Sequence, residues 1–225
     1  MDSNIFGFVR VPKTGGTFLS MQTLPHIRDY VGENSKLVHM PVSKVESLID
    51  KGTPLFTILR DPYERSCSEY YFIKRMGMRE YIKRFGRYGA IRLDKIEELA
   101  KIDVMNIYAT RLHSIYKYDM SIEDYLEYLG DCPIYPRFFD TKTPKDFDFV
   151  GITSEMNKTL DLVKNMYGFK LGSPHFNKND NKKVEDSYET GFSRSTFESN
   201  NPLEYELYYE GLKKFQELCK ENNIK

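Results

Sequence analysis

The sequence has few cysteines, no excess of either charge and no long apolar run. Its three cysteines, Cys67, Cys132 and Cys219, are far apart and form none of the close pairs that zinc sites and thioredoxin-like motifs require. Lysine and arginine together number 33, as do aspartate and glutamate, so no overall charge makes nucleic acid or an anionic membrane an obligatory partner. These absences predict reduced, structural thiols and binding guided by local charge, with no nucleic-acid partner.

Targeting and membrane-spanning signals are also lacking. No apolar stretch approaches the roughly 18 residues of a transmembrane helix. Met1 leads into a predicted strand without the basic and apolar regions of a signal peptide. We therefore expect a soluble protein of the cytoplasm. A chain of 225 residues can bury roughly 70% of its unfolded surface, which predicts one compact domain, residues 1–225.

Short apolar runs alternate with segments of helical periodicity along most of the chain. Strands are predicted at 5–9, 54–59 and 147–151, with a weaker one at 36–38. Helices are predicted at 17–27, 42–50, 62–76, 154–167 and 202–222. This alternation is typical of an α/β protein, and we expect a P-loop-like, doubly wound parallel sheet flanked by helices.

Two long segments lack the alternation. Residues 78–130 contain no convincing strand and favour several short helices, which we expect to form a mostly helical insertion over the sheet. Residues 172–201 are polar and rich in Asn, Lys and Ser, which predicts a long loop. Long loops within compact domains are often functional.

The strongest local signal is the segment Val11-Pro12-Lys13-Thr14-Gly15-Gly16-Thr17, between the first predicted strand and helix. A glycine pair there lets the backbone curl so that several N–H groups face one point, and the helix N-terminus adds a partial positive charge. Lys13 would add a full charge, and Thr14 and Thr17 would add hydroxyl donors. We expect a phosphate or sulfate to bind here. The alternative is a simple glycine turn with a solvated lysine.

The order of residues in this loop separates two families. The nucleotide-kinase loop has the form G-x-x-x-x-G-K-S/T, with lysine after the glycines, whereas Lys13 precedes them. The segment instead resembles the 5′-phosphosulfate-binding loop of sulfotransferases that use 3′-phosphoadenosine-5′-phosphosulfate (PAPS), especially the heparan sulfate 2-O- and 6-O-sulfotransferase branch. The resemblance implies that the donor is bound by Lys13, Thr14, Gly15, Gly16, Thr17 and Phe18.

A second segment is similar to the same family. Arg60-Asp61-Pro62-Tyr63-Glu64-Arg65-Ser66-Cys67-Ser68-Glu69-Tyr70 resembles R-D-P-x-x-R-x-x-S-x-Y, which implies that Arg60 and Ser68 hold the nucleotide 3′-phosphate. Arg60 ends a predicted strand, where open α/β sheets bind ligands, and its guanidinium can donate two N–H groups to a phosphate. Asp61 is expected to cap the following helix. Arg65 either pairs with Asp61 or has a role in binding.

Weaker similarities extend along the chain, at 149–155 and 201–208, so that the resemblance covers nearly all of it. The predicted general base is His39, which follows the weak strand on the edge where the other predicted site residues gather. In the resembled branch a histidine in this region is the proposed base, and part of that branch carries two where this chain has one. Glu33 is the alternative base, because other sulfotransferases use a glutamate. The other three histidines are expected to be structural: His26, His113 and His175.

Basic residues recur every four positions after the second motif, at Arg75, Arg79, Lys83 and Arg87. They would line one face if a helix ran through them, and an anionic acceptor such as an acidic glycan would suit that face. A solvated helix face is the alternative.

Together these patterns predict a sulfotransferase that passes a sulfuryl group from PAPS to the hydroxyl of an acceptor, a glycan or a small molecule, by in-line displacement. No metal is needed, and the product is adenosine 3′,5′-bisphosphate. Lys13 and the loop N–H groups would stabilise the leaving phosphate while His39 removes the acceptor proton. Two alternatives stay open: a P-loop-type small-molecule kinase, and a non-catalytic module that binds a nucleotide or a glycan.

Overall fold

The computed structural model of the chain describes residues 6–16, 19, 39–85, 111, 115, 118–129, 133–168 and 190–225. Over 76–85 it describes the backbone alone.

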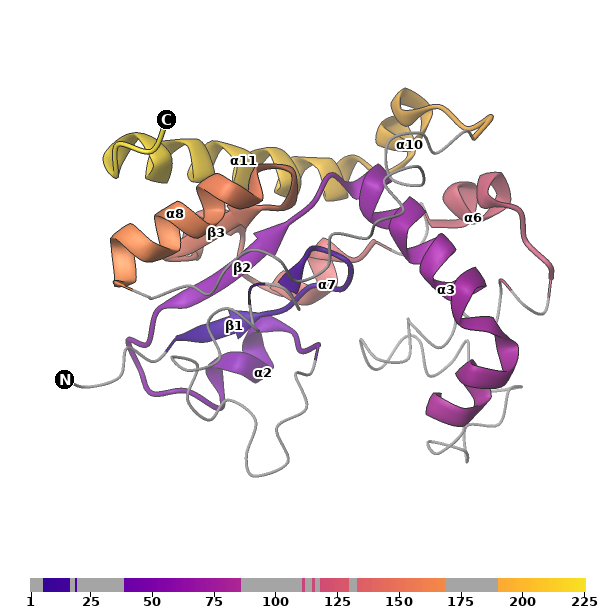
Figure 1. The fold of residues 1–225 in the computed structure, drawn as a ribbon, viewed down its shortest axis with the longest axis horizontal. Helices are drawn as coiled ribbons and strands as arrows, with labels where there is room; N and C mark the ends of the chain where they lie inside the picture. Colours follow the sequence, from indigo (N-terminus) through magenta and orange to yellow (C-terminus); the bar gives the residue numbers. More distant parts are fainter. Residues whose placement is uncertain are drawn as a thin grey trace.

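A small parallel sheet of three strands, in the order β1-β2-β3, forms the centre of the described structure (Figure 1). The strands are β1 (Gly7–Val9), β2 (Leu55–Leu59) and β3 (Phe149–Ile152). Every residue of β2 and β3 is buried, as expected for parallel strands that are covered on both faces. Because the strands run in the same direction, their carboxyl ends meet at one edge of the sheet.

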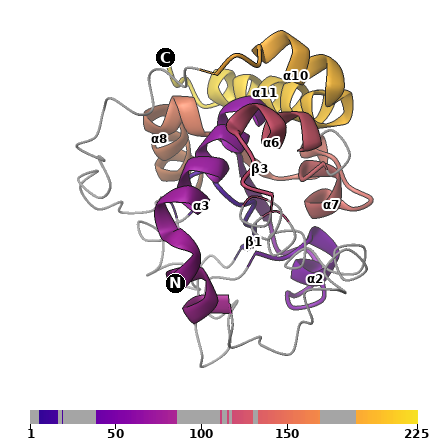
Figure 2. The same cartoon turned by 90° about the vertical axis from the view of Figure 1, so that its right-hand side faces the viewer.

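Helices pack around this sheet. They are α2 (Val42–Glu46), α3 (Pro62–Phe85), α6 (Ile122–Tyr128), α7 (Tyr135–Phe139), α8 (Met156–Tyr167), α10 (Arg194–Asn200) and α11 (Pro202–Glu221). Two 3₁₀ turns, η4 (Pro144–Asp146) and η5 (Thr153–Glu155), flank β3. Helices α8 and α11 contact β3, and α2 contacts β1. Helix α3 leaves the carboxyl end of β2, with α6 and α10 against it (Figure 2).

Aromatic side chains fill the core on the sheet. The rings of Phe6 and Phe56 stack with centroids 4.0 Å apart, and Phe56 stacks on Phe149 at 5.0 Å. Burying each such ring stabilises the fold by about 1.5–3 kcal/mol. Helix α11 lies close to the end of β2 at Gly211, where a Cβ atom would come within 2.1 Å of Leu59 Cδ1. The helix therefore needs glycine at this point to pack against the strand that leads into the second motif.

The predicted α/β class, with parallel strands and flanking helices, is confirmed. Strands β1 and β2 and helix α11 lie where the sequence placed them, and α8 follows β3 after one 3₁₀ turn. Strand β3 begins two residues later than predicted, because Phe147 and Asp148 form a bend. The Asp148 carboxylate accepts a hydrogen bond from the Leu55 N–H (2.8 Å), which holds this bend against the start of β2.

Three predicted boundaries were wrong. Helix α3 does not end near Met76 but passes Gly77 and continues to Phe85, so 78–85 belong to it rather than to a separate short helix. Helix α2 ends at Glu46 instead of Asp50, because the Ser47 hydroxyl donates to the Lys44 carbonyl (2.8 Å) and competes with further helical bonding. The predicted loop 172–201 contains α10, which Ser193 caps by accepting from the Thr196 N–H.

Several predictions lie outside the described residues. They include the strand at 36–38, most of the helix at 17–27 and of the insertion, Glu33, and the three histidines expected to be structural. At the start of the predicted first helix, the Leu19 N–H donates to the Gly15 carbonyl (3.2 Å). None of the described helices combines the length and the apolar composition that crossing a membrane requires.

Candidate functional site

Three chain segments meet at the carboxyl edge of the sheet: the loop 10–16 after β1, Arg60 after β2 and Thr153 after β3. The Thr153 hydroxyl lies 2.6 Å from the Thr14 carbonyl oxygen and 2.9 Å from that of Leu59, so it can donate to either. One side chain after β3 thus lies within hydrogen-bonding distance of both the first loop and the end of β2. The two sequence motifs that were predicted to act together are therefore adjacent.

The backbone of the loop curls as the glycine pair predicted. Lys13 and Gly15 have φ angles of 64° and 82°, both left-handed. For a residue with a side chain such as Lys13 this conformation costs about 1–2 kcal/mol. Consecutive residues of mixed handedness turn their N–H groups toward one side and form an anion-binding concavity. A Cβ atom at Gly15 would lie 2.9 Å from Met156 Cε, the far end of a flexible side chain, so the left-handed backbone rather than crowding favours glycine at this position.

The Thr14 side chain does not have the predicted role of donor toward an anion. It is almost fully buried, and its hydroxyl donates to the Val11 carbonyl at 2.9 Å. The hydroxyl thus stabilises the turn itself, and only the backbone N–H of Thr14 remains as a candidate ligand group. Thr17 and Phe18 lie outside the described residues.

Lys13 connects the loop to helix α3. Its Nζ lies 4.0 Å from the centroid of the Phe72 ring, within the range of a cation–π contact. Phe72 follows the half-buried Ser68 by one helical turn, and residues four apart share a helix face. The predicted lysine and the predicted serine therefore lie against the same face of α3.

His39 is oriented by the loop. Its Nδ1 is 2.8 Å from the Arg10 carbonyl oxygen. A carbonyl only accepts, so Nδ1 carries the hydrogen and Nε2 keeps its lone pair. Burial, with a smaller contribution from the charges of Arg10 and Lys13, lowers the pKa of His39 from 6.5 to about 4. The imidazole is neutral at pH 7 and can accept a proton at Nε2.

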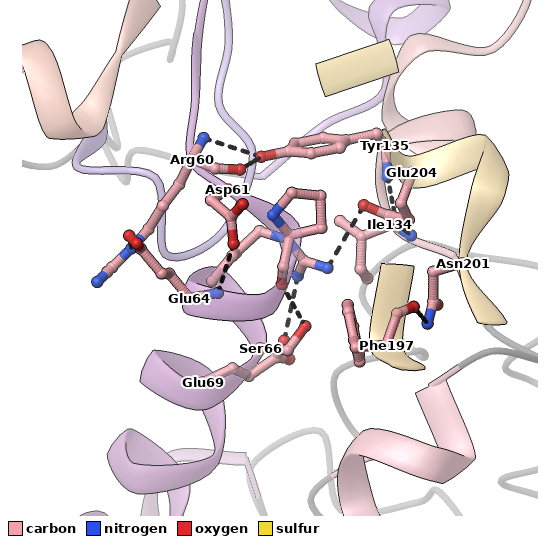
Figure 3. Close-up of polar contacts among 12 residues, drawn as sticks. Arg60, Asp61, Glu64, Ser66, Glu69, Ile134, Tyr135, Phe197, Asn201 and Glu204 are labelled. Atoms are coloured by element: carbon pink, nitrogen blue, oxygen red, sulfur yellow. Dashed lines mark hydrogen bonds and ion pairs between the residues drawn. The ribbon is translucent and has the colours of Figure 1, made fainter. Parts of the chain in front are cut away.

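Arg60 is fixed by its backbone and loosely paired by its side chain. Its N–H donates to the Tyr135 hydroxyl (2.9 Å), and that hydroxyl donates to the Arg60 carbonyl (Figure 3). Its Nε is 3.7 Å from Glu64 Oε2, and 14% of its side chain is exposed. Glu64 in turn is 2.9 Å from Arg194 Nη2. A phosphate at Arg60 would compete with one partly exposed carboxylate.

Asp61 and Arg65 have different partners. Asp61 caps α3 as predicted, since its Oδ1 accepts from the Glu64 N–H at 3.1 Å. Of the two alternatives for Arg65, the structure does not show the pairing with Asp61. The charge partner of Asp61 is Arg194, at 3.2 Å, whereas the buried side of α3 carries Arg65 into the core toward Glu69, one turn further along.

A buried ionic cluster that sequence reasoning missed lies beneath α3. Arg65 Nη1 and Arg111 Nη1 are 3.3 and 2.9 Å from Glu69 Oε2, and Arg65 Nη2 is 3.6 Å from Glu204 Oε2. All four side chains are at most 2% exposed. In the sequence, the four-residue spacing of Arg65 and Glu69 on a predicted helix could have indicated this ion pair. Arg10 was also missed, although a basic residue directly after the first predicted strand could have indicated it.

Within the described part of the chain, no three His, Cys, Asp or Glu side chains come together in a way that could hold a metal ion. Comparison of the chain with protein-family models, with curated proteins and with solved structures finds no match.

Proposed function

We propose that this protein is a sulfotransferase that transfers a sulfuryl group from PAPS to an acceptor hydroxyl. The observation that carries the proposal is the loop after β1, with left-handed backbone at Lys13 and Gly15, lying beside Arg60 at the end of the adjacent strand. Two phosphate-binding positions at neighbouring strand ends suit a donor with phosphates on both its 5′ and 3′ sides. The β1 loop and the parallel strands also suit the P-loop-like, doubly wound sheet that we predicted for such an enzyme.

In this proposal the loop binds the 5′-phosphosulfate, and Arg60 and Ser68 bind the 3′-phosphate. The loop supplies backbone N–H groups and the charges of Lys13 and Arg10, which lie around His39. The contact between Lys13 and Phe72 supports the assignment, because it brings the lysine to the helix face of Ser68. Arg60 can exchange its contact with Glu64 for a charge-assisted bond to phosphate.

The transfer is an in-line displacement. The acceptor oxygen forms a bond to sulfur while the bond from sulfur to the bridging phosphate oxygen breaks, and the acceptor proton passes to His39 Nε2. Lys13 and the loop N–H groups neutralise the charge that develops on the leaving phosphate. The negative charges of the donor favour the protonated imidazole and raise the pKa of His39 above about 4, so that the base becomes stronger when the donor is bound.

The acceptor that we propose is anionic, such as an acidic glycan. Helix α3 runs without interruption to Phe85, so positions 75, 79 and 83 recur on one continuous helix. The predicted basic face requires a helix that continues through these positions, and α3 provides it. Arg87 lies outside the described residues.

Nucleotide binding in the absence of magnesium tests the proposal. We expect adenosine 3′,5′-bisphosphate to bind at least roughly tenfold more tightly than AMP, ADP or ATP, because a charge-assisted contact to phosphate contributes about 1.5–3 kcal/mol. Arg60→Ala should remove most of this preference and Ser68→Ala less of it, while Lys164→Ala, an exposed change on α8, should leave it intact. Tighter binding of ATP would support the kinase alternative instead.

A further inference from the structure

Tyr135, the first residue of α7, holds both backbone polar groups of Arg60. Its side chain is fully buried, and its hydroxyl accepts from the Arg60 N–H at 2.9 Å and donates to the Arg60 carbonyl. Arg60 is the residue between the end of β2 and the cap of α3. One phenol therefore determines where the chain turns from strand to helix, and with it the point from which the Arg60 side chain starts (Figure 3).

Tyr135 is itself anchored by the buried ionic cluster. Glu204 of α11 accepts hydrogen bonds on Oε1 from the backbone N–H groups of Ile134 and Tyr135, the second at 2.9 Å. The guanidinium carbon of Arg65 lies 5.5 Å from the centroid of the Tyr135 ring, and Arg65 pairs with Glu204. The tyrosine is thus held at its backbone, its ring and its hydroxyl by groups from α11, α3 and the end of β2.

This arrangement fixes one end of Arg60 and leaves the other adjustable. The backbone has two hydrogen bonds to a buried group, whereas among the described residues the guanidinium has one ion pair, at 3.7 Å to the partly exposed Glu64. A side chain whose backbone is already fixed loses less conformational freedom when it binds a phosphate, and this favours binding.

We propose that Tyr135 is a positioning residue that sets Arg60 for the nucleotide 3′-phosphate, with Glu204 and Arg65 holding the tyrosine in place. The inference rests on the proposed function, since it assigns Arg60 to that phosphate. A tyrosine that only joined α7 to the sheet would affect stability but not the choice between nucleotides.

The test compares dissociation constants for adenosine 3′,5′-bisphosphate and AMP by calorimetry, in Tyr135→Phe, Arg60→Ala and the double variant. We expect Tyr135→Phe to lower the preference for the bisphosphate about two- to tenfold, the effect of a lost hydrogen bond, with AMP affinity little changed. In the Arg60→Ala background the same change should cause no further loss, because both act through one side chain. The matched control is Tyr205→Phe, which removes a hydroxyl from another buried tyrosine that makes no bond to Arg60.

The outcomes separate this inference from the proposed function. If the unmodified protein shows no preference for the bisphosphate, the proposed function fails and the inference with it. A second outcome is that the preference exists and depends on Arg60, but Tyr135→Phe keeps the full preference and only lowers the melting temperature. In that case the inference alone is overturned. Should Tyr135→Phe not fold, Glu204→Gln keeps an acceptor oxygen for both N–H groups and removes the charge beside Arg65. The neutral amide accepts more weakly and loses the ion pair with Arg65, so we expect a smaller drop in the preference, and an unchanged preference would overturn the assignment of Glu204 and Arg65 to holding the tyrosine.

Discussion

Mild acid is expected to destabilise the folded protein through His39. Burial, assisted by the nearby charges of Arg10 and Lys13, lowers the pKa of this imidazole from 6.5 to about 4. As the pH falls, the unfolded chain takes up the proton near pH 6.5 but the folded protein only near pH 4. Between these values the unfolded state binds more protons, so the free energy of unfolding decreases as the pH is lowered.

The size of the effect follows from the two pKa values of His39. They differ by about 2.5 pH units, and each unit corresponds to about 1.36 kcal/mol, so the loss between pH 7.5 and pH 4 is on the order of 3 kcal/mol. Because the side chain is half-buried, screening by water makes this an upper value. It is still a large part of the roughly 5–15 kcal/mol that stabilises a typical domain.

Urea unfolding at several pH values between 7.5 and 4.5 would measure this loss. The comparison is with His39→Asn, whose amide can still donate to the Arg10 carbonyl but does not titrate. All other titrating groups are shared, so subtracting the two pH profiles isolates His39. The unmodified protein should lose about 2–3 kcal/mol more than the variant. Parallel profiles would refute the reasoning that burial keeps this imidazole neutral.

Three further changes test the site. Lys13→Ala should greatly reduce turnover with the fold intact, because the lysine stabilises charge on the leaving group; near-normal turnover, comparable to Lys164→Ala, would contradict this role. His39→Ala should lower the transfer rate by roughly 10²- to 10⁴-fold with little change in donor affinity, and an unchanged pH–rate profile would place the base elsewhere. Glu69→Gln removes the negative charge with which the buried Arg65 and Arg111 both pair and should destabilise the protein by about 3–5 kcal/mol in urea unfolding. A loss below about 1 kcal/mol would show that the cluster contributes little to stability.

Local sequence patterns predicted the parts of the fold that depend on local physics. Strand β2 is apolar except for Thr57, and Asp61-Pro62 marks the start of α3 with a cap and a proline at the first helical position. The glycine pair indicated a curled loop, which has left-handed backbone at Lys13 and Gly15. Helix α10 was missed because Phe197 is its one buried residue, which leaves almost no hydrophobic periodicity.

Features that depend on distant residues were not predictable in this way. Besides Glu69, Arg65 pairs with Glu204, which lies 139 positions later in the sequence, and no spacing rule relates these two residues. The hydrogen bonds between the Tyr135 hydroxyl and the Arg60 backbone likewise join positions that only the folded chain brings together. The Thr14 hydroxyl was assigned to a ligand because its type fits, yet the turn brings a nearer acceptor, the Val11 carbonyl, to it.

The central claim is that the protein transfers sulfuryl groups, and the most direct test is to incubate it with PAPS carrying radiolabelled sulfate and a panel of hydroxyl acceptors. Acidic glycans, neutral glycans and small alcohols and phenols would be included, with Lys13→Ala as the control for background transfer. The proposed function predicts that label becomes bound to at least one acceptor, most of all an acidic glycan, and that adenosine 3′,5′-bisphosphate appears in equal amount. If no acceptor is labelled although the bisphosphate binds tightly, the account of a catalytic site is contradicted and the protein is a nucleotide-binding module.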